Sequence, residues 1–163
     1  MKVSELQEVF LTELGSLLPE WKYVNSPRTF KLKSGNFNWH LHISCINRAS
    51  GFDATADVAV EFLDKKKKLI IVGAELGNIE VAGQRRFPVI SYDDAVGSAR
   101  RLKLCFEAVG LPFLNLYSDP KVVLLSLKKG GKDAMLISPL PNLHDQQIEI
   151  LSQYIEECTQ QSV

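Results

Sequence analysis

The sequence predicts an α+β fold in which an antiparallel sheet of four to five strands is preceded by one helix and followed by about three helices. Three observations lead to this prediction. Apolar residues recur at helical spacing before Pro19, they alternate with polar residues from Trp21 to Phe62, and helical spacing returns after Ser91. The order of helix, strands and helices is typical of an α+β domain. Because 163 residues is the size of one domain, we expect a single globular domain over residues 1–163.

The first helix is predicted to open at Ser4, because the apolar residues between Leu6 and Leu18 fall on one helical face. Ser4 is followed three residues later by Gln7, which is a capping-box pattern for the start of the helix. Pro19 is expected to end it, since the residue before a proline is disfavoured in the α conformation.

The strands are clearest in two runs, Trp39 to Cys45 and Ala56 to Phe62, where apolar and polar residues alternate. Such alternation is typical of half-buried strands in an antiparallel sheet. Asp64 and the lysines 65–68 predict a charged turn before the next strand, Leu69 to Val72. Charge at such a turn also hinders association between sheet edges.

A long loop is predicted after Gly73, with a short strand at Asn78 to Val81. Ser91 with Asp94 then begins a helix that continues to Val109. Gly110 in a left-handed conformation is expected to close this helix, with Pro112 just beyond it.

Three more elements complete the predicted chain. Asp119 as cap and Pro120 in the first turn begin a helix that stops at Gly130 and Gly131. A short strand is predicted at Asp133 to Ser138. The last helix is predicted from Leu143 to Cys158, because its apolar residues recur at helical spacing.

The sequence favours a cytoplasmic protein that is not inserted in a membrane. Acidic and amide residues occupy the N-terminus where a signal peptide needs an apolar stretch, and no run of 18 apolar residues occurs. Cys45, Cys105 and Cys158 are far apart and lack the C-x-x-C spacing of zinc and redox sites. We therefore expect buried, reduced thiols and no cofactor.

The charges are balanced in number but not in position. Nineteen basic side chains match nineteen acidic ones, which argues against a nucleic-acid-binding protein. The segment from Trp21 to Phe52 nevertheless carries only basic charges, at Lys22, Arg28, Lys31, Lys33 and Arg48. The segment from Asp133 onward carries only acidic charges, and the first twenty residues are mainly acidic. Either the acidic helices neutralise the basic hairpin region within the molecule, or an acidic face stays open for a basic protein partner.

Two histidines suggest a metal site. His40 and His42 are two residues apart on a predicted strand, so both imidazoles point to one face. His144, Asp53 and Asp57 are candidates for further ligands. No third ligand lies nearby in the sequence, however, and alternating polar residues on a solvent-facing strand explain the pair as well. We therefore expect no metal.

Asp57 and Glu75 suggest a nuclease. In metal-dependent nucleases of the restriction-endonuclease fold, an acid on one strand and an E-x-K motif on the next hold Mg²⁺ and position a water molecule. Here Gly77 occupies the position of the lysine, so the charge arrangement is incomplete. Phosphate-binding loops, nucleophile elbows and zinc-protease motifs are absent from the sequence.

A set of short segments suggests a family likeness: 28–30, 39–46, Phe52, Gly110-Leu111-Pro112-Phe113-Leu114, Tyr117-Ser118-Asp119-Pro120 and Leu124-Leu125. These segments resemble a family of small bacterial proteins of unknown function, some of which are encoded beside toxins and are regarded as immunity proteins. The resemblance covers residues 6–127 and implies a helix, then an antiparallel sheet, then helices. It brings no catalytic residues. The chain departs from the family at 84–90, where a tryptophan-rich segment is common and only Phe87 is aromatic.

The leading hypothesis is a non-enzymatic cytoplasmic protein-binding module, and specifically an immunity protein that neutralises a toxin by occlusion. Its binding surface would be formed by Asp145, Glu149, Glu156 and Glu157, which would dock on a basic active site. One alternative is a diverged Mg²⁺-dependent nuclease that uses Asp57 and Glu75. A second alternative is a small-molecule or effector-binding domain with its ligand in a cleft between sheet and helices.

Overall fold

The computed structural model describes residues 1–63 and 68–161 and has an α+β fold. The chain begins with helix α1 (Val3–Leu17) and continues as strands β1 (Lys22–Val24), β2 (Thr29–Ser34), β3 (Phe37–Arg48), β4 (Gly51–Leu63) and β5 (Lys68–Glu75). The short helix α2 (Leu76–Ile79) and strand β6 (Phe87–Val89) follow. The helical part comprises α3 (Tyr92–Cys105), the π-helical turn η1 (Phe106–Gly110), α4 (Leu111–Tyr117), α5 (Pro120–Lys129), α6 (Gly131–Ile137), the 3₁₀ turn η2 (Pro141–Leu143) and α7 (His144–Gln160). The predicted fold class is confirmed.

The sheet is an antiparallel meander in the order β1-β2-β3-β4-β5, and β6 pairs with the first part of β4. The even-numbered residues of β4 from Phe52 to Phe62 are all buried, as their alternation predicts. The odd-numbered residues of β4 include Asp53, Asp57 and Glu61, so the opposite face is polar. A bulge between Val60 and Glu61 shifts the register of β4 against β5.

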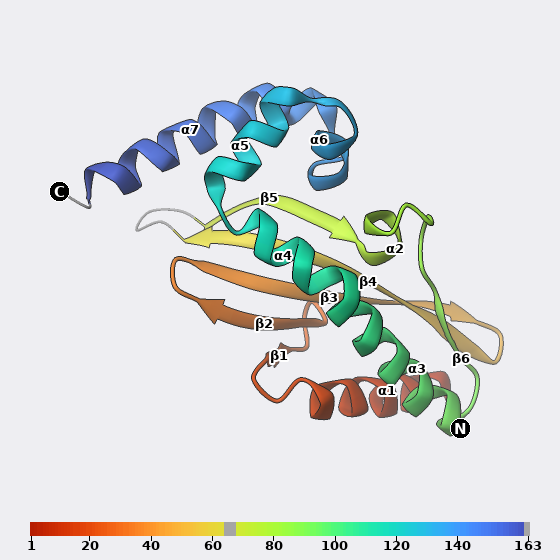
Figure 1. Cartoon of the computed structure of the whole chain (residues 1–163). Helices are drawn as coiled ribbons and strands as arrows, with labels where there is room; N and C mark the ends of the chain where they lie inside the picture. The colour runs from red at the N-terminus through yellow and green to blue at the C-terminus, as the bar shows by residue number, and fades with distance from the viewer. Residues whose placement is uncertain (64–67, 162–163) are drawn as a thin grey trace.

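The helices cover the apolar face of the sheet in two groups (Figure 1). Helix α1 lies below the sheet with α3 beside it, α3 continues into α4 in front of the sheet, and α5, α6 and α7 gather at the opposite end. Phe10 of α1 packs edge-on against Phe52 with ring centroids 5.8 Å apart. Tyr154 of α7 packs against Phe62 at the same centroid distance, 5.8 Å. One buried apolar cluster therefore connects the first helix to the last.

The start of α1 and the loop after β5 differ from the predictions. Helix α1 begins at Val3 because the Glu5 carboxylate, and not Gln7, accepts the backbone N–H of Lys2, at 2.7 Å. The strand predicted at Asn78 to Val81 is wrong. The chain forms the helical turn α2 there, and the short strand comes later, as β6. The predicted charged turn lies mostly at residues 64–67, outside the described part of the chain.

The predicted helix end at Gly110 is also wrong. Gly110 has a φ of −69°, and the helix continues through η1 into α4 and ends only at Tyr117. The glycine is explained by close packing, because a Cβ there would lie 2.6 Å from the Phe106 ring. Pro112 is tolerated because it lies in the first turn of α4, directly after the π-helical turn.

The predictions for the C-terminal part are mostly confirmed. Asp119 caps α5 by accepting the backbone N–H of Lys121 at 2.8 Å, and α5 ends before Gly130. The strand predicted at Asp133 to Ser138 is wrong, because that segment forms α6 and buries Ala134 and Ile137, three residues apart. Helix α7 lies within two residues of the predicted range at both ends. The expectation of buried thiols is wrong for Cys158, which is exposed on this helix. Among the described residues, no helix combines the length and the apolar character that crossing a membrane requires.

Candidate functional site

A row of polar residues crosses the polar face of the sheet and includes both residues of the predicted nuclease pair. Asp57 on β4 is the register partner of Glu75 on β5 and of His42 on β3. His42 in turn is opposite Thr29 on β2, and the His42 Nδ1 lies 3.1 Å from the Thr29 Oγ1. The fold therefore brings Asp57 and Glu75 together on neighbouring strands.

Glu75 has structural partners for both of its carboxylate oxygens. Its Oε2 accepts the backbone N–H groups of Gly77 at 2.9 Å and Asn78 at 3.2 Å, and its Oε1 accepts the N–H of Arg85 at 3.1 Å. Burial is the largest influence on the pKa of Glu75 and raises it. The three hydrogen bonds lower this pKa, and the neighbouring Asp57 charge raises it, both by less than burial does. Glu75 thus caps α2 and fastens the following loop.

The position expected for a catalytic lysine has no room for a side chain. A Cβ on Gly77 would lie 1.8 Å from the Gly83 carbonyl oxygen and 2.6 Å from the Arg85 nitrogen. Both are backbone atoms of the same loop, so the loop would have to move to admit any larger residue. The E-x-K part of a nuclease site therefore cannot form in this loop conformation.

Asp57 differs from Glu75 because its carboxylate accepts no hydrogen bond from the described residues. Burial raises its pKa, and the neighbouring His42 opposes this rise. The side chain borders a cavity of about 450 Å³. Residues that line this cavity are Asp57, Ala59, Gly73 and Glu75 from the sheet, and Met135 and Pro139 from the α6 region.

The two histidines lie on one face, as predicted, but have different partners. The His40 Nε2 is 3.4 Å from the Glu61 Oε2, whereas His42 contacts Thr29 and Ser44. Burial lowers the pKa of His40, and the Glu61 charge opposes this effect. His144 Nε2 lies 2.7 Å from the Ser138 carbonyl oxygen, in the α6–α7 connection. Within residues 1–63 and 68–161, no three His, Cys, Asp or Glu side chains are grouped to hold a metal ion.

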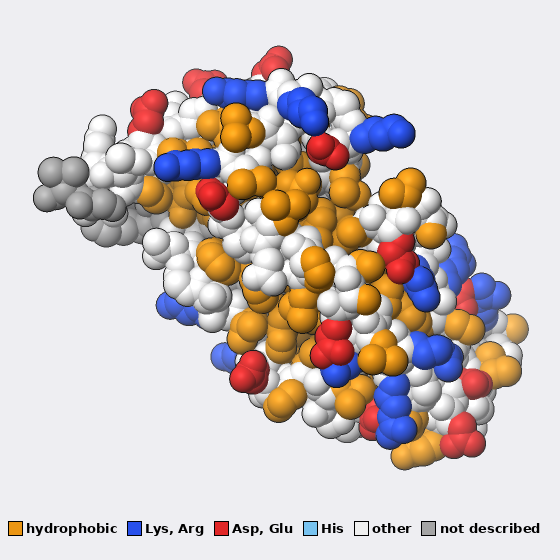
Figure 2. Space-filling model, viewed as in Figure 1, with side chains coloured by type: hydrophobic (Ala, Val, Ile, Leu, Met, Phe, Trp, Pro, Cys, Tyr) orange, Lys and Arg blue, Asp and Glu red, His pale blue; other side chains and the backbone are white. Residues whose placement is uncertain are grey.

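The predicted partner-binding residues Asp145, Glu149, Glu156 and Glu157 form what we term the α7 acidic surface. All four side chains are exposed. Asp145, Glu149 and Glu156 are spaced by four and seven residues, so they share one helical stripe, and Glu157 lies beside it. The stripe is opposite the face that buries Leu151 and Tyr154. Figure 2 shows acidic side chains along the outer side of α7.

The basic hairpin region does not neutralise this surface. Among the described residues, none of the ion pairs joins α7 to a lysine or arginine. Arg48 pairs with Asp53 on the neighbouring strand, and Arg28 donates to the neutral Gln7 of α1 at 3.0 Å. Glu13 of α1 pairs with Arg100 of α3 at 2.9 Å. The two opposite charge clusters therefore remain separate.

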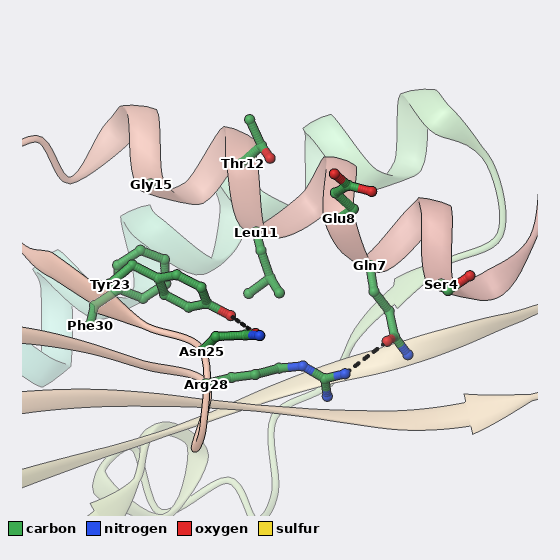
Figure 3. Close-up of a pocket in the computed structure, with 10 residues that line it drawn as sticks. All are labelled: Ser4, Gln7, Glu8, Leu11, Thr12, Gly15, Tyr23, Asn25, Arg28 and Phe30. Atoms are coloured by element: carbon green, nitrogen blue, oxygen red, sulfur yellow. Dashed lines mark hydrogen bonds between the residues drawn. The ribbon is translucent and has the colours of Figure 1, made fainter.

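A groove that the sequence did not indicate lies between α1 and the β1–β2 hairpin (Figure 3). Its volume is about 560 Å³. The residues that define this α1 groove are Gln7, Leu11 and Gly15 from the helix, and Tyr23, Arg28 and Phe30 from the hairpin. The basic character of the hairpin was visible in the sequence. The position of Arg28 beneath a helix was not, because it depends on how α1 packs on the sheet.

The comparisons with known proteins supply no relative for this chain. No protein-family model, no curated protein and no solved structure matches it. The resemblance to small bacterial proteins that include immunity proteins therefore stays a prediction.

Proposed function

We propose that this protein is a non-enzymatic binding module whose α7 acidic surface docks on a basic protein partner, and that a nuclease-type toxin domain is the most concrete partner. The observation that carries this proposal is that four acidic side chains of α7 are exposed and that no described lysine or arginine pairs with them. These residues are Asp145, Glu149, Glu156 and Glu157.

The packing of α7 supports a docking role, because it fixes the helix backbone that carries the carboxylates. Leu151 is fully buried, and the Tyr154 hydroxyl donates to the Leu63 carbonyl oxygen at 3.3 Å. The stripe of Asp145, Glu149 and Glu156 therefore faces solvent from a helix anchored on its opposite side. A helix that is already held in place loses less conformational entropy on binding than a flexible segment would.

The mechanism is occlusion. Acidic side chains steer a basic partner toward α7 during diffusion, and like charges reject acidic competitors. When the partner is a nuclease, the cationic site that binds nucleic-acid phosphates is the surface that the α7 carboxylates would cover. No catalytic group of this chain is required for such inhibition.

The test uses the full chain and a purified nuclease-type toxin domain whose active site is basic. We expect co-elution from a sizing column at micromolar concentration and weaker association as salt rises. The double variant Glu149→Lys, Glu156→Lys should abolish the complex. The double variant Glu8→Lys, Glu20→Lys on and beyond α1 changes the net charge by the same amount and should leave the complex intact. Equal loss with both variants, or no loss with either, would contradict the proposal.

A Mg²⁺-dependent nuclease is the second candidate, and the register pairing of Asp57 with Glu75 is the observation that favours it. The three backbone hydrogen bonds to Glu75 and the lack of space at Gly77 weigh against it. Incubation of the purified chain with plasmid DNA and Mg²⁺ separates the two functions. Plasmid cleavage by the parent protein that is lost in Asp57→Ala would show that the nuclease function is right and the binding function is wrong.

A further inference from the structure

We propose that the α1 groove binds a small carboxylate with an elongated apolar body. This site is separate from the α7 acidic surface, because α1 and α7 lie at opposite ends of the molecule (Figure 1). The groove volume of about 560 Å³ lies within the usual range of small-molecule sites.

Arg28 supplies the anion-binding group. It is half-buried at the base of the groove, where its Nη2 donates to the Gln7 Oε1 at 3.0 Å. None of the ion pairs of the described residues involves Arg28. A guanidinium group has five N–H donors in a planar fork, so the bond to Gln7 leaves donors for a second, anionic partner.

The other end of the groove is apolar. The Tyr23 and Phe30 rings pack together with centroids 4.8 Å apart, and Leu11 points toward them from α1 (Figure 3). Gly15 leaves the space above Phe30 open, since a Cβ at this position would already lie 3.6 Å from the ring. The groove thus has a cationic end at Arg28 and an apolar end between Leu11 and Phe30.

The charge of the lining favours a monoanion. Arg28 is the only cation among the described residues that line the groove, and Glu8 also borders it. A phosphate dianion would meet one positive charge and one negative charge. A carboxylate matches the planar guanidinium with two parallel hydrogen bonds and carries a single charge.

The experiment compares octanoate, octanamide and octyl phosphate as probes with the full chain, by titration followed in two-dimensional NMR spectra. We expect octanoate to shift the signals of α1 and the β1–β2 hairpin in a saturable manner. Octanamide should bind at least about tenfold more weakly, because it cannot form the charge-assisted pair. Tighter binding of octyl phosphate would overturn the carboxylate assignment, and no saturable shift with octanoate would overturn the site.

Two variants locate the binding. Arg28→Gln should weaken octanoate binding about tenfold by removing the charge. Gly15→Leu should weaken it by filling the apolar end. Lys31→Gln removes a half-buried cation from the same strand region but outside the groove lining, and should have no effect. Thermal unfolding checks that each variant folds. If Arg28→Gln does not fold, the octanoate binding of Gly15→Leu decides the test. Unchanged octanoate binding in a folded groove variant would refute the site.

Discussion

Asp57 shows how burial controls a single ionisable group in this sheet. Its carboxylate is half-buried between His42 and Glu75 and accepts no hydrogen bond from the described residues. Burial raises its pKa, so the folded protein holds this proton to higher pH than the unfolded chain does. The protonated group therefore contributes its full stability only below the ordinary pKa of 3.8. The free energy of unfolding falls as pH rises from there through the raised pKa of the folded protein.

Asp57→Asn should remove this pH dependence. The variant cannot ionise, so we expect its free energy of unfolding to exceed that of the parent protein above the pH range of the Asp57 titration. The difference should shrink below pH 3.8. The Asp57 charge also raises the pKa of Glu75. Its removal therefore stabilises the ionised Glu75, which further increases the free energy of unfolding of the variant.

Urea unfolding of both proteins at several pH values measures this effect. The exposed Glu149→Gln in the middle of α7 is the control and should change stability by less than about 0.5 kcal/mol at every pH. An Asp57→Asn protein that is less stable than the parent at neutral pH would show that the ionised carboxylate is stabilised by its surroundings.

At the scale of elements, the long helix from α3 through η1 to α4 has one tightly packed position, Gly110. A Cβ on Gly110 would lie 2.6 Å from the Phe106 ring and 3.0 Å from the Leu76 side chain, so the helix, its π-helical turn and α2 meet at this point. Gly15 of α1 is different, since its Cβ would make an ordinary contact of 3.6 Å with Phe30. Two helical glycines thus have opposite surroundings.

Gly110→Ala and Gly15→Ala should therefore change stability in opposite directions. Alanine is favoured over glycine inside a helix by about 0.8–1 kcal/mol, so Gly15→Ala should stabilise the protein by up to that amount. Overpacking should make Gly110→Ala destabilising by about 1–3 kcal/mol. Chemical unfolding at fixed pH measures both, and stabilisation by Gly110→Ala would mean that the Phe106 ring moves aside without cost.

The α7 acidic surface could be predicted at this scale, because helical periodicity alone places Asp145, Glu149 and Glu156 on one stripe. The course of the chain around Gly110 could not. A glycine followed by a proline is a usual helix end, and only the packing of the Phe106 and Leu76 side chains against the glycine reveals another reason for it. The helix α6 was missed because its apolar residues also fit a short buried strand, and periodicity does not separate the two in a short segment.

At the scale of the whole molecule, α7 shares a buried cluster with the sheet and α1. We therefore predict a single unfolding transition in which the helical end and the α1 end of the molecule unfold together. Leu151→Ala should lower the free energy of unfolding by about 2–5 kcal/mol, because Leu151 is 0% exposed.

Ile150→Ala is the matched control for Leu151→Ala. Ile150 is 38% exposed on the same helix, so Ile150→Ala should lower the free energy of unfolding much less than Leu151→Ala does. Far-ultraviolet and near-ultraviolet circular dichroism should report the same midpoint for each protein. Two separate transitions, with only one affected by Leu151→Ala, would mean that α5–α7 is an independent unit.

The sequence by itself determined the α+β class, the meander of strands and the position of most helices, because these depend on periodicity and on local capping. It also determined which segments carry which charge. Only the tertiary structure decided that Asp57 and Glu75 are neighbours, that Glu75 is engaged by the backbone, and that the opposite charges remain apart. Register and helix packing depend on contacts between residues distant in sequence, and local patterns contain no information about those distances. The α1 groove belongs to the same class, since it exists only where α1 meets the hairpin at Arg28.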